Sequence, residues 1–464
     1  MIKNRIWKRA VCLVLSAFCV FQINPVNVKA ADYWPEAPAI ETPSAIVMEM
    51  NTGAILYEKN ADEQLYPASI TKIVTALVAL ENGTLSDVVT FSDASIDNTE
   101  GSGIARDYGE QMTLEQCLYG MLLSSSNECA YAIAEHVGGT YENFVTMMNE
   151  KAKELGCINT HFTNPHGLPD DDHYISSHDM AVLASAAYEN ETFRIIVGTA
   201  RYEIPPTNKH SEPTPLQNHN EMLYPFKTSK YVYEYCTGGK TGYTSVANST
   251  LVTFAEKDGM KLVCVVMNTQ SPNHWLDSIS LFDYCFDNFQ LLNISENETN
   301  YVSTEDVESG TLNENEPFVE LDKTACIVLP KTAEFSDAES TVLYNDEVSP
   351  VAGTLSYTYA GHEVGGADIV TTGVKIEGQI FDNQIEESTE LSDVEETTIQ
   401  IKPITIFFIV LAILLLIVLL FLGKYVYDNF YIIRHNMSVE KSRKDQFKRM
   451  KNSKKRRRRR GFFK

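Results

Sequence analysis

Two hairpin patterns at opposite ends of a long helical segment place the strongest constraint on how this chain folds. Each pattern has two strand-like runs around a Gly-containing turn: Ser44–Met50 with Ala54–Glu58, and Leu251–Ala255 with Lys261–Met267. Strands at both ends of a segment, with helices between them, predict one antiparallel sheet that distant parts of the chain close, with a helical lobe beside it. We therefore expect an α/β (α+β) fold over residues 31–295.

The segment between the hairpins is predicted to form the helical lobe. Apolar residues recur there at helical spacing, and several of the runs end at glycine, which commonly terminates a helix. The predicted helices are Ser69–Glu81, Leu114–Leu123, Asn127–Val137, Tyr141–Leu155 and Ser177–Tyr188.

The two ends of the chain predict export and attachment to a membrane. Residues 1–30 have a basic start, an apolar run and a small-x-small site at Val28–Ala30, the pattern of a cleaved secretory signal peptide. An uncleaved anchor is the alternative. The stretch Ile404–Leu422 has nineteen residues without a charge and predicts one transmembrane helix within residues 403–423.

The distribution of charge predicts the orientation of the chain. Residues 424–464 hold 16 Lys/Arg and 3 Asp/Glu, so the positive-inside rule predicts a cytoplasmic tail that contacts anionic lipid headgroups. Residues 31–423 hold 59 Asp/Glu and 17 Lys/Arg, which argues against nucleic acid as a partner. We expect a single-pass protein of the cell membrane whose catalytic part is extracytoplasmic.

Residues 296–402, which precede the predicted transmembrane helix, divide into three predicted parts. Residues 296–316 are polar and acidic, as in a linker, and residues 385–402 resemble an acidic stalk. Residues 317–384 predict a small all-β C-terminal domain, in which Thr354–Tyr359 and Asp368–Thr371 flank a turn around Gly361–Gly366.

Seven of the nine cysteines follow the signal peptide, which is an odd number. They are widely spaced and form no C-x-x-C pair, so we expect no zinc cluster and expect several to be small core residues. The sequence leaves open whether any of them form a disulfide.

A serine and a lysine share one face of the first predicted helix. Ser69 and Lys72 are three residues apart and therefore lie on the same side, at the start of the helix after Pro67 and Ala68. Free backbone N–H groups at a helix start favour an oxyanion. Taken alone, the pair is better explained as an N-cap serine and a solvated lysine.

Two further motifs accompany this pair. Ser125 and Asn127 form an S-x-N motif between two predicted helices, a position that also suits a simple N-cap. Lys240-Thr241-Gly242 is the only K-T-G in the chain and lies in a predicted strand before the second hairpin. S-x-x-K, S-x-N and K-T-G in this order, outside a membrane, are a far more specific signal than any one of them.

This trio resembles the signature of penicillin-binding proteins and class A β-lactamases. Residues 34–385 resemble the low-molecular-weight penicillin-binding proteins, which are serine-type D-alanyl-D-alanine carboxypeptidases. The resemblance includes the stretches NTGAILYEKNADEQLYPASITKIVTAL, SSSNECAYAIAEHVGG, NPHGLPDDDHYISSHDMAVLA, NHNEML and GGKTGYT, with Ser126 and Glu128 as departures from the family pattern. It implies the penicillin-binding protein/β-lactamase-like transpeptidase fold, and peptidoglycan stem peptides ending in D-Ala-D-Ala and β-lactams as ligands.

The resemblance also implies roles for the motif residues. Ser69 would be the acyl-ester nucleophile, Lys72 the general base, Ser125 a proton relay and Asn127 a support for Lys72 and the substrate. The substrate-binding residues would be Lys240, Thr241, Gly242 and Tyr243, with an oxyanion hole at the backbone N–H groups of Ser69 and Tyr243. A neutral lysine is needed for a base, and burial together with a second cation lowers a lysine pKa.

Four histidines need separate weighing. His274 stands three residues before Asp277, where the family often has an arginine that supports carboxylate binding, so we expect altered substrate affinity. His166, His173 and His178 lie near several aspartates but form no H-E-x-x-H motif. We expect a polar loop near the cleft, with no metal and no organic cofactor.

Two other functions fit parts of the pattern. A class A β-lactamase needs a glutamate for deacylation, and no E-x-x-L-N motif lies between Asn127 and Lys240. A non-catalytic penicillin-binding wall sensor is compatible with the histidine at position 274. The intact motif residues favour the carboxypeptidase over both.

Overall fold

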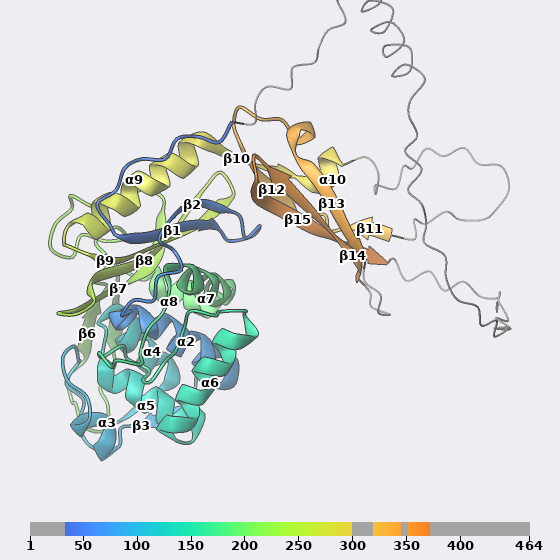
Figure 1. Cartoon of the computed structure of the whole chain (residues 1–464). Helices are drawn as coiled ribbons and strands as arrows, with labels where there is room; N and C mark the ends of the chain where they lie inside the picture. Colours follow the sequence, from blue (N-terminus) through green and yellow to red (C-terminus); the bar gives the residue numbers. More distant parts are fainter. Residues whose placement is uncertain (1–32, 299–318, 345–350, 372–464) are drawn as a thin grey trace, which may run out of the picture. The chain divides into compact units, whose positions relative to one another are not determined.

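The computed structural model describes residues 33–298, 319–344 and 351–371, which all belong to one compact unit (Figure 1). Several predicted segments lie outside the described residues: the signal peptide 1–30, nearly all of the linker 296–316, the stalk 385–402, the transmembrane helix 403–423 and the tail 424–464. Within the described ranges, no helix combines the length and the apolar character needed to cross a bilayer.

The first sheet joins the two ends of the helical segment, as predicted. Its strand order is β2-β1-β9-β8-β7 and all pairs are antiparallel. The strands are β1 (Ser44–Glu49), β2 (Ile55–Lys59), β7 (Cys236–Thr244), β8 (Asn248–Lys257) and β9 (Met260–Thr269). The central contact is β1 against β9, in which Ser44 faces Met267 and Glu49 faces Leu262.

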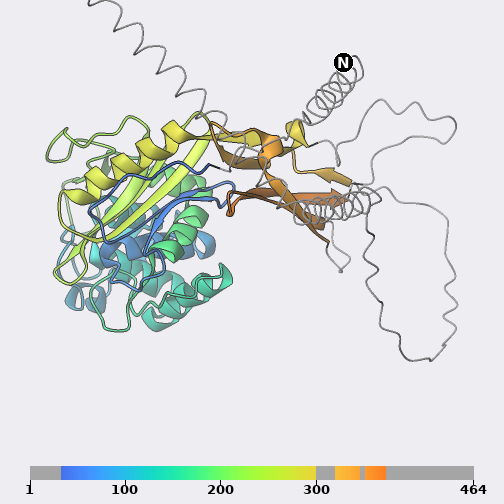
Figure 2. The same ribbon diagram turned by 45° about the horizontal axis from the view of Figure 1, so that its top comes forward.

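Both faces of this sheet are covered, which explains why its central strands are apolar throughout. Side chains alternate along a strand, so Val263 and Val265 of β9 pack into the helical lobe while Leu262 and Cys264 pack on the opposite face. Helix α9 (Asn273–Asn288) covers that opposite face, as Figures 1 and 2 show.

The helical lobe contains the predicted helices, with ends that move by one or two residues. Its helices are α2 (Thr71–Asn82), α3 (Asp93–Asp97), α4 (Leu114–Leu123), α5 (Asn127–Gly138), α6 (Tyr141–Glu154), α7 (Ser177–Glu189) and α8 (Glu191–Val197). Most begin at a capping residue. Thr113 forms a reciprocal capping box with Gln116 before α4, and the Ser126 hydroxyl accepts the Cys129 N–H at the start of α5.

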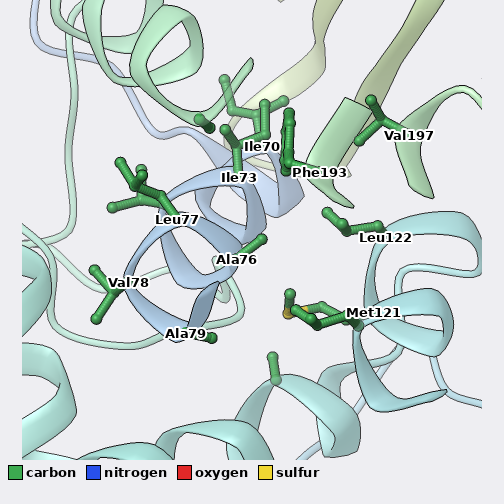
Figure 3. Close-up of a cluster of buried hydrophobic side chains, with 14 of the residues drawn as sticks. Ile70, Ile73, Ala76, Leu77, Val78, Ala79, Met121, Leu122, Phe193 and Val197 are labelled. Carbon is green, nitrogen blue, oxygen red and sulfur yellow. The ribbon is translucent and has the colours of Figure 1, made fainter. Parts of the chain in front are cut away.

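Helix α2 lies at the centre of the lobe. Its residues from Thr71 to Ala79 are all buried, because helices α4 to α8 pack around it, with apolar side chains such as Leu122 and Phe193 facing it (Figure 3). A helix that is covered on every side has no solvated face on which to place a charge. Lys72, which α2 carries, is therefore inside the protein.

Several elements were not predicted from the sequence. They include α3, α8, α9, the short antiparallel pairs β3 (Val88–Thr90) with β4 (Gln111–Thr113) and β5 (Arg201–Ile204) with β6 (Thr214–Gln217), and strand β10 (Phe289–Asn293). The strands of three to five residues are too short to show a clear alternating pattern.

A second antiparallel sheet has the order β10-β12-β15-β14-β13, with β11 also paired to β15. Its strands are β10, β11 (Val319–Leu321), β12 (Cys326–Pro330), β13 (Glu339–Tyr344), β14 (Val351–Tyr359) and β15 (His362–Thr371). The short helix α10 (Ile294–Asn297) follows β10. Its first strand comes from residues before the predicted linker. The turn after β14 is also tighter than predicted: Ala360 and Gly361 have φ of +52° and +81°, and β15 starts at His362.

Phe254 joins the first sheet to the helical lobe and provides a test of this packing. Its buried ring lies 4.3 Å from the ring of Tyr188 and 6.0 Å from that of Phe193, measured between centroids. We predict that Phe254→Ala lowers the free energy of unfolding by about 3–5 kcal/mol, because it leaves a cavity between the two layers. Denaturant titration measures the loss. Leu343→Ala, at a side chain that is 65% exposed, should change it by less than about 0.5 kcal/mol.

Candidate active site

Ser69 lies in a 3₁₀ turn, Ala68–Ile70, that precedes α2, and not in the first turn of the α-helix as predicted. Ala68 has φ of +51°, a left-handed conformation that is unusual for alanine. The carbonyl of Ala68 accepts a hydrogen bond from the Thr71 hydroxyl at 2.9 Å. The turn thereby holds a half-buried serine at the edge of the helical lobe.

Lys72 is fully buried directly beneath this serine. Three oxygens lie within hydrogen-bond distance of its Nζ: Ser69 Oγ at 3.1 Å, Asn127 Oδ1 at 2.6 Å and the carbonyl of His166 at 2.6 Å. None of the three belongs to a carboxylate, so no counter-charge from the described residues contacts the amine. The structure thus places the predicted nucleophile and the predicted base within hydrogen-bond distance.

The surroundings of Lys72 favour its neutral form. Burial lowers the pKa of Lys72 well below its usual value, and the nearby charge of Lys240 lowers it further, against smaller raising effects from Glu128 and Cys129. A neutral amine can accept a proton from a serine hydroxyl, whereas an ammonium group cannot. This lysine is therefore electrostatically suited to be a base.

The S-x-N motif lies between α4 and α5, as predicted. Ser125 has φ of +62°, so it stands in a tight turn, and the N-cap of α5 is Ser126. Asn127 begins α5, and its side chain reaches both Lys72, through Oδ1, and the carbonyl of Glu100, through Nδ2. Its amide therefore bridges the buried lysine and a loop at the rim of the lobe.

Lys240 completes the cluster from the first sheet. It is buried on β7, and its Nζ donates to Ser125 Oγ at 3.1 Å and to the carbonyl of Thr241 at 2.9 Å. Burial lowers the pKa of Lys240 to about 7. The sheet and the lobe thus each supply one buried lysine, and each lysine contacts one of the two predicted serines.

Strand β7 passes close to the 3₁₀ turn Ala68–Ile70, which we call the nucleophile turn because it carries the predicted nucleophile Ser69. A Cβ atom at Gly242 would lie 2.9 Å from the backbone nitrogen of Ser69 and 2.3 Å from Thr250 Oγ1. Thr250 in turn donates to the carbonyl of Pro67 at 2.9 Å. A glycine in K-T-G therefore lets the strand approach the turn. Tyr243, the next residue, points its side chain outward and is 71% exposed.

Comparison with known proteins agrees with this geometry. A family model described as D-alanyl-D-alanine carboxypeptidase matches residues 31–271, more than half of the chain. The chain belongs to the D-alanyl-D-alanine carboxypeptidase family.

Relatives and solved structures support the assignment to this carboxypeptidase family. D-alanyl-D-alanine carboxypeptidase DacF of Bacillus subtilis is 33% identical over 320 residues, which cover 67% of this chain and 78% of that protein. DacA of Haemophilus influenzae is 30% identical over 316 residues, covering 64% of this chain and 77% of that protein. A structure of the DD-transpeptidase of Streptomyces K15 has a TM-score of 0.51 at 30% identity and covers 55% of this chain and 100% of that chain. The resemblance inferred from the motifs and the penicillin-binding protein-like fold are confirmed.

Of the three histidines predicted to lie in a polar loop, His166 and His173 contact the site of this carboxypeptidase-family chain, whereas His178 lies in α7. The carbonyl of His166 accepts from Lys72, and the ring of His173 bonds to Thr71 Oγ1 through Nε2 while its Nδ1 accepts the Thr163 N–H. Burial lowers the pKa of both rings to about 3, so both are neutral at pH 7. His178 instead pairs with Asp179. In the described part of the chain, no group of three His, Cys, Asp or Glu side chains is arranged to hold a metal.

His274 differs from an arginine in more than its length. It lies in the first turn of α9, is buried, and its Nδ1 has no hydrogen-bond partner among the described residues. Burial lowers its pKa to about 4, so the ring carries no charge at neutral pH. Asp277, three residues on, accepts from the N–H and hydroxyl of Thr42 and so ties α9 to the chain before β1. No permanent cation stands at position 274.

Sequence reasoning missed the backbone atoms and the glycine that complete the site. The carbonyl groups of His166 and Glu100 hold Lys72 and Asn127, and a carbonyl is present at every position, so it leaves no signal in the sequence. Gly167 was also missed. Its φ is +86°, and a Cβ there would lie 1.9 Å from the carbonyl oxygen of Ala68. The sequence did contain a signal for Gly167, because this glycine follows His166 in NPHGLPDDDHY, part of one of the stretches that resemble the family.

Gly167 provides a direct test of how the nucleophile turn is held. We predict that Gly167→Ala lowers the rate of labelling by a fluorescent penicillin at least tenfold, because the Ala68 carbonyl must move. The matched control is Gly259→Ala, whose φ of +81° is similar but whose Cβ meets nothing within 4 Å. Gly259→Ala should cost about 1–2 kcal/mol of stability from backbone strain and keep normal labelling. Equal labelling by both variants would show that the contact with Ala68 is unimportant.

Proposed function

We propose that this chain is a serine-type D-Ala-D-Ala carboxypeptidase that removes the terminal D-alanine from peptidoglycan stem pentapeptides through an acyl-enzyme on Ser69. The observation that carries the proposal is the 3.1 Å contact between Ser69 Oγ and the Nζ of a buried lysine that has no carboxylate partner in the described part of the chain. Membership of the carboxypeptidase family supplies the reaction class.

The acylation step follows from this contact. Neutral Lys72 removes the hydroxyl proton of Ser69, and the oxygen attacks the carbonyl carbon between the two D-alanines. The backbone N–H groups of Ser69 and Tyr243 stabilise the negative charge that develops on the carbonyl oxygen. The C–N bond then breaks, and the leaving amine takes a proton that passes from Lys72 through Ser125.

The deacylation step restores the enzyme. Lys72 is neutral again once its proton has left with the amine, so it activates a water molecule that attacks the ester carbon. The C–O bond to Ser69 breaks, the hydroxyl regains its proton, and the shortened stem peptide leaves. A β-lactam follows the acylation step only, because its ring-opened leaving group stays attached and blocks the water.

Recognition of the chain end rests on the opposite wall of the site. The terminal carboxylate of the substrate binds to Lys240 and to the Thr241 hydroxyl on β7, which lies beside the Ser69 turn. Asn127 binds the peptide group of the substrate while it holds Lys72. His274 is neutral, so Lys240 supplies the positive charge for this carboxylate.

We also propose a location for the reaction. The signal-like residues 1–30, the uncharged stretch Ile404–Leu422 and the basic residues 424–464 support an enzyme with its catalytic part outside the cell membrane and a cytoplasmic tail. The second sheet would be a small β domain between the catalytic part and the anchor. This arrangement suits a substrate that is itself extracytoplasmic.

A comparison of ligands tests the function. The soluble part before the membrane stretch is incubated with a fluorescent penicillin and with a pentapeptide ending in D-Ala-D-Ala. We predict a stable penicilloyl adduct and release of D-alanine, both lost in Ser69→Ala, since the serine oxygen forms the acyl bond. Rapid turnover of the penicillin would indicate a β-lactamase, and labelling without D-alanine release would indicate a sensor. Undiminished labelling of Ser69→Ala would refute the nucleophile.

The pH dependence of acylation tests the two lysines. Acylation requires neutral Lys72, so kcat/KM should rise as pH increases through the lowered pKa of Lys72. Binding of the carboxylate requires charged Lys240, whose pKa is about 7, so kcat/KM should fall above about pH 7. Lys240→Arg keeps its charge at high pH, and its profile should lose the alkaline fall. A wild-type profile that stays flat up to pH 9 would contradict the role of Lys240.

A further inference from the structure

Glu128 is a buried carboxylate that the mechanism above does not use. It follows Asn127 in the first turn of α5 and is only 7% exposed. Within the described residues it forms no ion pair with a lysine or arginine, and its Oε1 accepts the N–H of Ile104 at 2.6 Å. A buried carboxyl group needs compensating contacts, so the groups around Glu128 indicate what it does.

The contact with Ile104 fixes the loop Thr99–Arg106 at the rim of the site. A Cβ at Gly103 would lie 2.8 and 2.9 Å from the two carboxylate oxygens, so the loop backbone rests directly on Glu128. The carbonyl of Ile104 accepts from Nε and Nη2 of Arg106, at 3.2 and 2.9 Å. Residue 104 is thus held on one side by Glu128 and on the other by Arg106.

The same loop holds Asn127. The carbonyl of Ser102 accepts the Asn127 N–H at 2.8 Å, and the carbonyl of Glu100 accepts its side-chain amide. A cavity of about 420 Å³, lined in part by Thr99, Ser102 and Glu128, lies against the loop, so little packing holds it on that side. The contacts of Glu128 and Arg106 therefore determine where the loop, and with it the Asn127 amide, is placed.

Glu128 also contributes to the charge around Lys72. Lys240 of β7 opposes a positive charge on Lys72, while Glu128 and Cys129 of α5 favour it. His166 and His173, from the loop on the other side, are neutral at pH 7. Among these neighbours, Glu128 has the largest effect in favour of the charged form of Lys72.

We propose that Glu128 is a positioning residue for the carboxypeptidase reaction, whose carboxylate holds the loop Thr99–Arg106 so that Asn127 stays on Lys72, and keeps a negative charge beside that lysine. The inference rests on the proposed function through Lys72. Its test therefore uses penicillin acylation of full-length protein, and wild-type acylation that requires Ser69 must be observed first. If wild type fails to acylate, the proposed function fails; if only the Glu128 variants depart from expectation, this inference fails.

The first test separates charge from shape. Glu128→Gln keeps an oxygen acceptor for Ile104 but removes the negative charge, so Lys72 loses its proton more readily. The acid limb of the acylation–pH profile should move by about one unit to lower pH. The matched control is Glu135→Gln, on the same helix, where the carboxylate accepts the Ser92 hydroxyl instead. An acid limb in Glu128→Gln that coincides with that of Glu135→Gln would overturn the role of the charge.

The second test is a double-mutant cycle on the loop contact. Gly103→Ala pushes against the carboxylate and Glu128→Ala removes it, so each should lower the acylation rate about tenfold or more at the optimal pH. In the double variant the alanine Cβ at position 103 meets no carboxylate. Its rate should therefore be no lower than that of Glu128→Ala alone. Thermal unfolding checks that the variants are folded. Losses that simply multiply would overturn the positioning role.

Discussion

The burial of the Lys72 amine between the sheet and the helical lobe is the interaction on which the rest of the active site depends. An ammonium group in an apolar interior costs several kcal/mol unless nearby groups compensate. Here three oxygen atoms lie within hydrogen-bond distance of Nζ, and each comes from a different part of the chain: Ser69, Asn127 and the carbonyl of His166. A neutral amine donates its two N–H groups to the Asn127 and His166 oxygens, which only accept, and its lone pair is then free to accept the hydrogen of the Ser69 hydroxyl. Burial and the charge of Lys240 favour this neutral form.

The support around this lysine comes from turns and loops, while the regular elements supply rigidity. Ala68 and Ser125 adopt left-handed conformations of the kind that cost roughly 1–3 kcal/mol. Both stand at or next to reacting groups, where the turn aims a hydroxyl toward a lysine. Helix α2 is buried from Thr71 to Ala79, the Ser126 hydroxyl caps α5, and Lys240 and Gly242 of β7 are buried, so these elements can hold the turns against relaxation. The side chains of this site are thus positioned mainly by the turns that join helices and strands.

The sequence predicted those parts of the fold and the site that depend on the regular spacing of side chains. The hairpins at the two ends gave the antiparallel sheet, and the spacing of Ser69 and Lys72 gave their shared face. The 3₁₀ turn was not predicted, because it depends on the backbone angle of Ala68, which the residue type does not reveal. Carbonyl contacts were missed for the same reason. Helix α9 was not predicted, although Trp275, Phe282 and Phe286 recur at helical spacing and form an apolar face that indicates a helix.

The pairing of β1 with β9 determines when the active site comes into existence. Strand β9 separates β1 from β8 and β7, so the sheet that brings Lys240 to Ser125 is incomplete until the chain up to Thr269 is available. Contacts between such distant segments form slowly. Until then the sheet and the charge of Lys240 are missing from the surroundings of Lys72, and both help to favour its neutral form. A chain that ends before Thr269 therefore contains Ser69 and Lys72 but not the environment that suits this lysine as a base.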